Sequence, residues 1–302
     1  MRTFTLLLLF NCLLLTQTAY SQGCSDAGFC SLDGIQSSDS QNNSFKNQFT
    51  LGSSYGIADH GITIIAPYFS YQRSLGESLS ISTKLTSIQQ SGGEIKNSGL
   101  SDVFVSARYQ LSSKTNLTAG AKLPLSDGNE FFNSVDPLPL DFQPSLGTTD
   151  IIVGFATKVK TLQINVATQL PISQGENTFL SEAYDSSSFY SEFQSTNNYN
   201  RKGDVLLRGT YEISKTEKLR FTSSLLSIYH LGNDTYEDTN NVEKEIEESS
   251  GLTVNLNLFL DYNLSHNGSL NFSVGSPIVV RKIRPDGLTR SFIATIAYRY
   301  QF

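Results

Sequence analysis

The C-terminal stretch 291–302 reads S-F-I-A-T-I-A-Y-R-Y-Q-F, and its alternation decides the fold. The residues between the aromatic and apolar positions are mostly polar or small, as expected for a β-strand with one apolar face. An open strand edge in lipid would leave backbone N–H and C=O groups unsatisfied. The stretch therefore predicts the final strand of a closed membrane β-barrel, paired with the first strand. Counting back from the end, every second residue belongs to the apolar face: Phe302, Tyr300, Tyr298, Ile296, Ala294 and Phe292.

The aromatic C-terminus also resembles a known signal. Phe302, with aromatic residues two and four positions upstream, is similar to the terminal signature that the bacterial outer-membrane assembly machinery reads. The resemblance implies the bacterial outer membrane as the location. It also implies outer-membrane lipid and lipopolysaccharide as surroundings, and the barrel-assembly machinery as a partner that binds Phe302.

The N-terminus carries an export signal. One positive charge precedes an apolar run at 4–15, and small residues flank Tyr20 at Ala19 and Ser21. This run is too short to span a bilayer comfortably, so we interpret 1–21 as a cleaved signal peptide. Residues 22–43 are rich in Ser, Asp, Gln, Asn and Gly and predict a flexible periplasmic segment, which leaves 44–302 as the barrel.

Cysteine usage fits an exported chain. Cys12 leaves with the signal peptide, so Cys24 and Cys30 remain in an oxidising compartment and predict a disulfide. The alternative is a lipid anchor on Cys24. Gly23 fits such an anchor site, but Ser21 stands where leucine is usual.

Composition favours a membrane barrel and excludes one class of partner. Charged residues make up 17% of the chain, against about 25% in soluble domains. The polar faces of the alternating segments consist largely of Ser, Thr, Asn, Gln and Gly rather than Lys and Glu. The formal charge of −6 argues against nucleic acid, because no basic face exists to neutralise phosphates.

Alternating segments recur along the whole chain and predict its topology. Tight turns and long loops alternate between them, with a shorter loop at 91–98 and long loops at 126–146, 173–202 and 232–250. Short turns on one side and long loops on the other are typical of outer-membrane barrels. We predict an all-β, antiparallel up-and-down barrel of twelve strands with apolar faces outward. The expected strands are 45–58, 62–73, 79–90, 99–111, 115–125, 147–159, 162–172, 203–213, 218–230, 252–264, 269–280 and 288–302.

An internal repeat leads to a family resemblance. The sequence G-L-S-D-V at 99–103 recurs as G-T-T-D-I at 147–151 and, shortened, as G-D-V at 203–205. Likewise L-P-L-S-D-G at 123–128 recurs as L-P-I-S-Q-G at 170–175. The pattern resembles outer-membrane barrels grouped with the meta-pathway phenol-degradation proteins, which are related in style to fatty-acid transporter channels. That resemblance implies uptake of small organic molecules, although this chain lacks the long N-terminal hatch of gated fatty-acid channels.

Parity places a set of charged residues on the inner face of the predicted barrel. A mixed-charge lumen with Thr, Asn and Gln between the charges suits a narrow aqueous path for small polar or amphipathic solutes. The alternative is that these charges pair across the barrel and fill it, or that the aspartates only cap strand ends. The candidate lumen-lining residues are Asp102, Arg108, Lys122, Asp150, Lys158, Asp204, Arg208, Glu212, Arg220, Asp261 and Arg299.

Two long loops have distinctive compositions. The loop at 173–202 is aromatic and predicts a constriction or ligand surface at the mouth, or a loop that packs on itself. The loop at 232–250 is acidic; it offers cation bridging to lipopolysaccharide or simply solvated charge, and its spacing matches no calcium loop. The aromatic candidates are Phe179, Tyr184, Phe189, Tyr190, Phe193 and Tyr199.

These features predict a passive channel or uptake port for small molecules, with no cofactor and no metal site. The alternatives are a closed barrel whose external loops bind a ligand or surface, and a lipolytic enzyme. Only Ser227 and His230 offer a catalytic pair, and no orienting carboxylate stands at a recognisable spacing. We therefore assign no catalytic residue and expect no enzyme.

Overall fold

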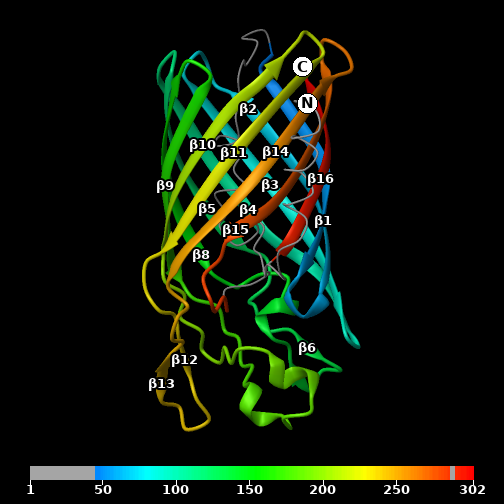
Figure 1. Ribbon diagram of the computed structural model, residues 1–302, viewed down its shortest axis with the longest axis vertical. Coiled ribbons are helices and arrows are strands. Elements are labelled where there is room, and N and C mark those ends of the chain that lie inside the picture. Colours follow the sequence, from blue (N-terminus) through cyan, green and yellow to red (C-terminus); the bar gives the residue numbers. More distant parts are fainter. Residues whose placement is uncertain (1–44, 286–289) are drawn as a thin grey trace, which may run out of the picture.

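The computed structural model describes residues 45–285 and 290–302 and shows a closed antiparallel barrel of twelve strands (Figure 1). The prediction of a twelve-stranded all-β barrel is confirmed. In chain order the barrel strands are β1 (Asn47–Ala58), β2 (Thr63–Ser74), β3 (Leu79–Gly92), β4 (Ile95–Ser112), β5 (Thr115–Pro124), β8 (Thr149–Val159), β9 (Leu162–Ser173), β10 (Asp204–Lys215), β11 (Leu219–His230), β14 (Gly251–Asn263), β15 (Gly268–Val279) and β16 (Arg290–Gln301).

The last strand closes the barrel on the first, as the C-terminal stretch predicts. β16 pairs antiparallel with β1, with Tyr300 opposite Phe49 and Tyr298 opposite Leu51. The pairing continues to the end of the chain, where the backbone N–H groups of Asn47 and Phe302 each donate to the other residue's carbonyl over 2.9 Å. Closure removes the unpaired edge that an open sheet would expose to lipid.

The two ends of the barrel differ. Five tight turns lie at one end together with Asn47 and Phe302, and we call this the turn end; the long connections lie at the other, the loop end (Figure 1). No helix among the described residues is long and apolar enough to cross a membrane. The loop end holds short elements: η2 (Asp59–Gly61), β6 (Phe131–Phe132), β7 (Asp136–Pro137), η3 (Leu140–Phe142), η4 (Ser181–Ala183), η5 (Phe189–Glu192), β12 (Thr235–Glu237) and β13 (Glu243–Glu245).

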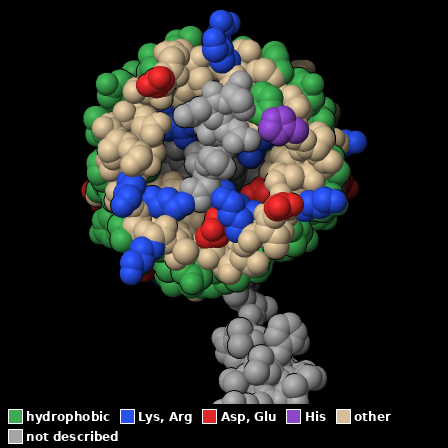
Figure 2. Space-filling view, turned by 90° about the horizontal axis from the view of Figure 1, so that it is seen from above, with side chains coloured by type: hydrophobic (Ala, Val, Ile, Leu, Met, Phe, Trp, Pro, Cys, Tyr) green, Lys and Arg blue, Asp and Glu red, His purple; other side chains and the backbone are tan. Residues whose placement is uncertain are grey.

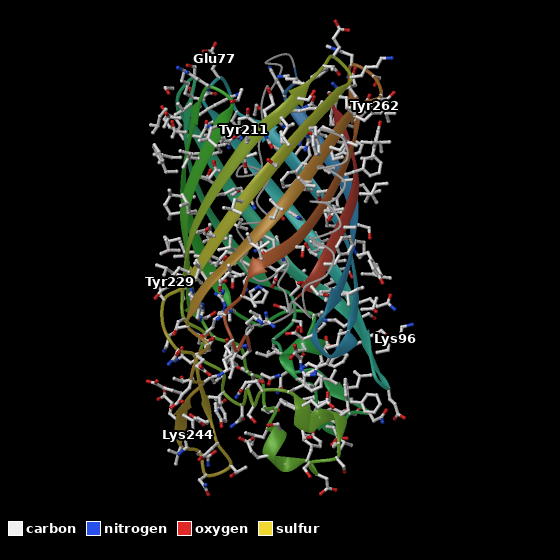
Figure 3. All side chains as sticks on the ribbon, in the orientation of Figure 1. Glu77, Lys96, Tyr211, Tyr229, Lys244 and Tyr262 are labelled. Carbon is white, nitrogen blue, oxygen red and sulfur yellow. The ribbon has the colours of Figure 1, made fainter. Side chains whose placement is uncertain are left out.

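The outer face of the barrel is apolar and exposed. Leu51, Leu207 and Ile296 keep 61%, 50% and 51% of their surface accessible, as do many leucines, valines and isoleucines of the same parity. In Figure 3, Tyr211 and Tyr262 lie near the turn end and Tyr229 near the loop end of this face. An apolar band between aromatic residues is the surface that a bilayer covers.

One predicted loop is wrong. Residues 91–98 were expected to form a loop, but β3 and β4 extend towards each other and pair as far as Gly92 and Ile95. Gly93 adopts a left-handed φ of +55°, which glycine reaches without steric cost, and so allows a two-residue turn. The β3–β4 hairpin therefore projects beyond the barrel wall at the loop end.

The inner face is not uniformly polar, contrary to the expectation that hydroxyl and amide residues line it. Phe104, Ile152, Ala167, Leu206 and Leu226 alternate with outward residues and form a buried apolar cluster inside the wall of β4 and β8–β11. Period-2 alternation predicts which residues share a face, and it does not say that the inner face touches water everywhere.

The repeated glycines meet at the loop end. Gly147 has φ +73°, and a Cβ built on it would lie 2.0 Å from the Asp127 carbonyl oxygen and 2.8 Å from the Cα of Gly175. A Cβ on Gly175 would lie 2.1 Å from the Leu146 carbonyl oxygen. The glycine that opens one motif therefore packs between the ends of the two proline-containing motifs. Close backbone approach explains why the motif contains glycine there.

The remaining domain boundaries stay predictions. The signal peptide at 1–21, the segment at 22–43, and Cys24 and Cys30 lie outside the described residues.

Candidate functional site

The external loops pack together into one body, which we call the cap: 126–148, 174–203 and 231–250. Its apolar core packs against the inward side chains of β1–β4 rather than standing free in solvent. This explains why alternation is blurred in β2, since Ile64 and Ala66 face inward and contact the cap. The core consists of Ala58, Ile62, Ile64, Ala66, Ile88, Ile95, Leu138, Phe142, Phe179 and Phe193.

The predicted aromatic loop residues form the centre of this core. Tyr184 and Tyr190 stack with ring centroids 4.7 Å apart, and Phe189 meets Phe193 edge-on at 5.0 Å. Phe179 completes the group at 5.8 Å from Tyr184. Aromatic pairs at these distances add about 0.5–1.5 kcal/mol each beyond area burial. The loop thus packs on itself as well as covering the mouth.

Tyr199 belongs to a second part of the cap. It packs with Leu140 and Ile246, and its hydroxyl donates to Asp234 Oδ2 over 2.8 Å. Tyr199, Phe179 and Phe193 are at least 96% buried, so a ligand approaching from outside contacts none of their faces.

Three motif aspartates ring the inner wall at the loop end. Asp102 on β4 accepts from Ser145 Oγ over 2.6 Å, which ties the 126–148 loop to the wall. Asp150 on β8 lies 3.8 Å from Arg201 NH1, and Asp204 on β10 forms an ion pair with Arg201 NH2. The aspartates therefore anchor loops, in addition to facing inward as the parity predicts.

Lys122 of β5 belongs to the same ring. Its Nζ lies 3.3 Å from Asp150 Oδ2 and donates to Thr148 Oγ1 over 2.7 Å. Gln169 of β9 also donates to Asp150. All of these side chains are almost fully buried. Their pairing is therefore important for stability, because an unpaired buried charge is costly in free energy.

His230 links the wall to the third loop. Its Nδ1 lies 2.7 Å from Asp204 Oδ1 and its Nε2 lies 2.8 Å from Asp234 Oδ1, and the side chain is 1% exposed. A neutral imidazole has one N–H and donates once, so with two carboxylate partners an additional proton must lie on the ring or on one of the two carboxyl groups.

Asp234 collects donors from several segments. It accepts from Tyr199 and from the backbone N–H of Lys202, and Arg281 NH1 lies 3.9 Å away. We call the whole set the rim network, which has four basic and four acidic side chains: Lys122, Arg201, His230, Arg281, Asp102, Asp150, Asp204 and Asp234.

Sequence reasoning missed half of this network. It identified the repeated aspartates and Lys122 but not Arg201, Asp234 or Arg281, and it considered His230 only as a catalytic candidate. One local signal existed, because Arg201 precedes Asp204 by three residues and His230 precedes Asp234 by four. Nothing in the spacing indicated that these loop ends fold back to the wall.

The other predicted lumen residues lie on inward positions between the rim and the turn end. Arg220 Nε lies 3.0 Å from Glu212 Oε2, and Asp261 stands directly opposite Arg220 on β14. Figure 2, seen from the turn end, shows Lys and Arg side chains on the inner side of the ring and hydrophobic side chains outside it. These positions are Arg108, Lys158, Arg208, Glu212, Arg220, Asp261 and Arg299.

A polar stripe follows β11 and β14 on the inner face. Ser224 Oγ, Thr222 Oγ1 and both side-chain polar atoms of Asn255 are buried and have no hydrogen-bond partner within the described part of the chain. Asn257 Nδ2 is in the same situation. Buried polar groups are almost always hydrogen-bonded, so these side chains distinguish this stretch of the inner face.

The catalytic pair suggested by the sequence is wrong. Ser227 stands in register with Leu207, which faces outward, whereas His230 faces inward and both its nitrogens are engaged by carboxylates. A residue three positions away on a strand lies on the opposite face. Ser227 therefore cannot use His230 as a base.

The described residues offer no metal centre. No group of three or more His, Cys, Asp or Glu side chains that could hold a metal ion occurs among them. In the acidic loop, β12 and β13 form a hairpin in which Lys244 Nζ lies 3.7 Å from Asp238 Oδ2.

The cap should loosen as the pH rises. Burial raises the pKa of Asp141 from its usual 3.8 to about 7, with His60 opposing and Asp59 adding to the rise. A raised pKa means stability that is complete below about pH 4 and is lost as the pH rises to about 7. A protease active at pH 5 and pH 8 should cut the cap faster at pH 8, and Asp141→Asn should remove most of this difference. An unchanged difference in Asp141→Asn would show that another group controls it.

Comparison with known proteins identifies the fold. No family model matches this chain, and no curated protein matches it. An outer membrane channel from Pseudomonas putida F1 is similar, with a TM-score of 0.51 and 11% identity over 85% of this chain and 96% of that one. The translocator domain of the autotransporter NalP from Neisseria meningitidis is also similar, with a TM-score of 0.51 and 9% identity over 89% of this chain and 91% of that domain.

These likenesses, at such low identities, concern the fold. The chain has the fold of bacterial outer-membrane β-barrels, with a porin-like architecture. In barrels of this class short turns face the periplasm and long loops face outward, so we expect the turn end to be periplasmic and the cap to be external.

Proposed function

We propose that this barrel is a passive channel for small molecules. The observation that carries the proposal is the polar stripe on β11 and β14, where Asn255, Ser224 and Thr222 present to the interior polar atoms that have no hydrogen-bond partner among the described residues. A barrel closed by packed side chains would pair such groups, because each unsatisfied one costs about 1–3 kcal/mol. Water and polar solutes inside the lumen supply the missing bonds.

The cap acts as the outer filter of this channel. Its apolar core packs against β1–β4, and the rim network ties it to β8, β10 and β11 on the opposite side. A cap held from both sides lies across the external mouth and admits only small solutes. We also propose that the barrel-assembly machinery contacts Phe302 and that lipopolysaccharide surrounds the cap.

The repeat-based resemblance to the phenol-degradation-like barrels narrows the class of solute that we propose for the channel. It favours small organic molecules as solutes. The inner apolar cluster around Phe104 and Leu206 lies next to Asn255, which is opposite Leu226, so the lumen offers both apolar and hydrogen-bonding contacts.

Single-channel recording in planar bilayers tests the channel, and excising part of the cap tests the filter. Phe179 and Thr196 are joined by a 2.9 Å backbone hydrogen bond, so 180–195 can be removed with the new ends already adjacent. We expect the wild type to conduct weakly and the excised variant several-fold more. The matched control removes 239–241 and so shortens the β12–β13 hairpin. These residues lie between Asp238 and Val242, and the Asp238 N–H donates to the Val242 carbonyl.

Two outcomes would contradict the proposal. A folded protein that never conducts, with or without 180–195, would exclude a channel. Excision that abolishes binding to a surface or ligand while permeability stays unchanged would favour the alternative, a closed barrel with adhesive loops.

A further inference from the structure

The wall of the lumen is basic although the chain as a whole is acidic. Between the rim network and the turn end, the inward charged positions of the described strands are basic at six places and acidic at two. The whole chain carries a formal charge of −6. The basic positions are Lys84, Arg108, Lys158, Arg208, Arg220 and Arg299, and the acidic ones are Glu212 and Asp261.

The two carboxylates are grouped around a single cation. Glu212 forms an ion pair with Arg220 over 3.0 Å, and Asp261 stands opposite Arg220 on the next strand while accepting from Asn271. Among the described wall residues between the rim network and the turn end, the acidic side chains therefore lie on β10 and β14. The remaining basic positions are spread around the circumference, on β3, β4, β8, β10 and β16.

The cation on β3 is held inside the barrel by an aromatic neighbour. Lys84 Nζ lies 4.1 Å from the ring centroid of Tyr68. That ring in turn lies over Gly52 of β1, where a Cβ would approach it to 2.5 Å. A cation over an aromatic face keeps its positive charge, so Lys84 contributes to the field of the lumen.

The rim network does not cancel the positive charge of the wall. The rim network is balanced, with four basic and four acidic side chains, so it adds no net charge at the mouth. The acidic side chains of the β12–β13 hairpin are exposed to electrolyte, where the screening length is about 10 Å at 0.1 M salt. Charges on the low-dielectric wall of a narrow passage act more strongly on a permeating ion than screened external charges do.

We propose that the lumen selects anions and that its natural solutes are small organic carboxylates. Rings of Arg and Lys side chains select anions in membrane pores, and the guanidinium fork matches a carboxylate better than an ammonium does. The amides of Asn255 and Asn257 supply neutral hydrogen-bonding partners for the rest of such a molecule. This inference rests on the proposed channel function and specifies its solute.

Reversal potentials across a salt gradient measure the selectivity. In a KCl gradient we expect chloride to permeate at least about threefold better than potassium, in line with the counter-ion enrichment of charged clefts. Sodium gluconate and N-methylglucamine chloride then compare organic ions of similar size, and gluconate should carry current while N-methylglucamine does not.

Charge variants locate the selectivity. Lys158→Gln combined with Arg299→Gln should lower the chloride preference by about half, because six basic and two acidic wall positions leave four net positive charges and the double variant loses two of them. The matched control is Lys114→Gln, which removes an exposed cation from the periplasmic turn and should leave the ratio unchanged. Heat-modified migration on gels confirms that each variant is folded before recording.

The outcomes separate this inference from the channel itself. A conducting wild type that prefers potassium, or shows no preference, overturns anion selectivity and leaves the channel standing. Equal ratios in the double variant and the wild type show that the wall cations do not set the selectivity. A folded protein that never conducts overturns both proposals.

Discussion

His230→Ala should convert a weakly conducting barrel into a more open one. The ring bridges Asp204 on the wall and Asp234 in the cap over 2.7 and 2.8 Å, and its removal leaves two buried carboxylates facing an empty space. Removing one partner of a buried ion pair costs about 3–5 kcal/mol. Entry of water solvates these carboxylates at the lowest cost in free energy, and it detaches the 231–250 loop from the wall.

The measurements follow from that detachment. Mean conductance should rise several-fold, and limited proteolysis should cut the 231–250 loop much faster than in the wild type. The matched control is His266→Ala, at the exposed turn before β15, where the ring meets only Phe45 among aromatic partners of the described residues. If conductance and proteolysis are unchanged in His230→Ala, the rim network does not hold the cap.

The same variant separates the channel from the lipolytic alternative. An enzyme that used His230 would lose its activity, whereas a channel gains conductance. Because Ser227 faces lipid beside Leu207, we expect neither the wild type nor His230→Ala to hydrolyse phospholipid.

The barrel was predictable because its rules are local. Alternation in 291–302 and in β14 assigns each residue to a face, and turn length assigns each end, without knowledge of any distant contact. An error of a few residues at a strand end changes neither the face assigned by alternation nor the end assigned by turn length. The misplaced 91–98 loop accordingly did not change the strand count.

The cap was not predictable, because its contacts join distant segments. The link from His230 to Asp204 spans 26 residues, and the link from Arg281 to the Ser249 carbonyl spans 32. Ile64, Ala66 and Ile88 are apolar although they face inward, because their partners are cap residues rather than water or lipid. Positions that break the strand pattern thus mark where the inner wall touches protein.

Gly147→Ala should disrupt the loop end more than any other single methyl addition. Gly147 combines a left-handed φ of +73° with backbone on both sides, and the new Cβ would lie 2.0 Å from the Asp127 carbonyl oxygen. The left-handed conformation alone costs about 1–2 kcal/mol for a residue with a side chain. The clash is with backbone rather than with a flexible side chain, so the two proline-containing motifs must separate.

That separation reaches the rim network. Thr148 and Asp150 follow Gly147 directly and hold Lys122, and the Ser145 hydroxyl that binds Asp102 accepts from the Gly147 N–H over 3.0 Å. Gly147→Ala should therefore unfold at a markedly lower temperature in heat-modifiability gels and show higher conductance. Gly209→Ala is the control, since its Cβ meets nothing within 4 Å and its φ is not left-handed. Because both variants add one methyl group to a glycine in or beside a barrel strand, equal behaviour would mean that the glycine contact at the loop end has no structural role.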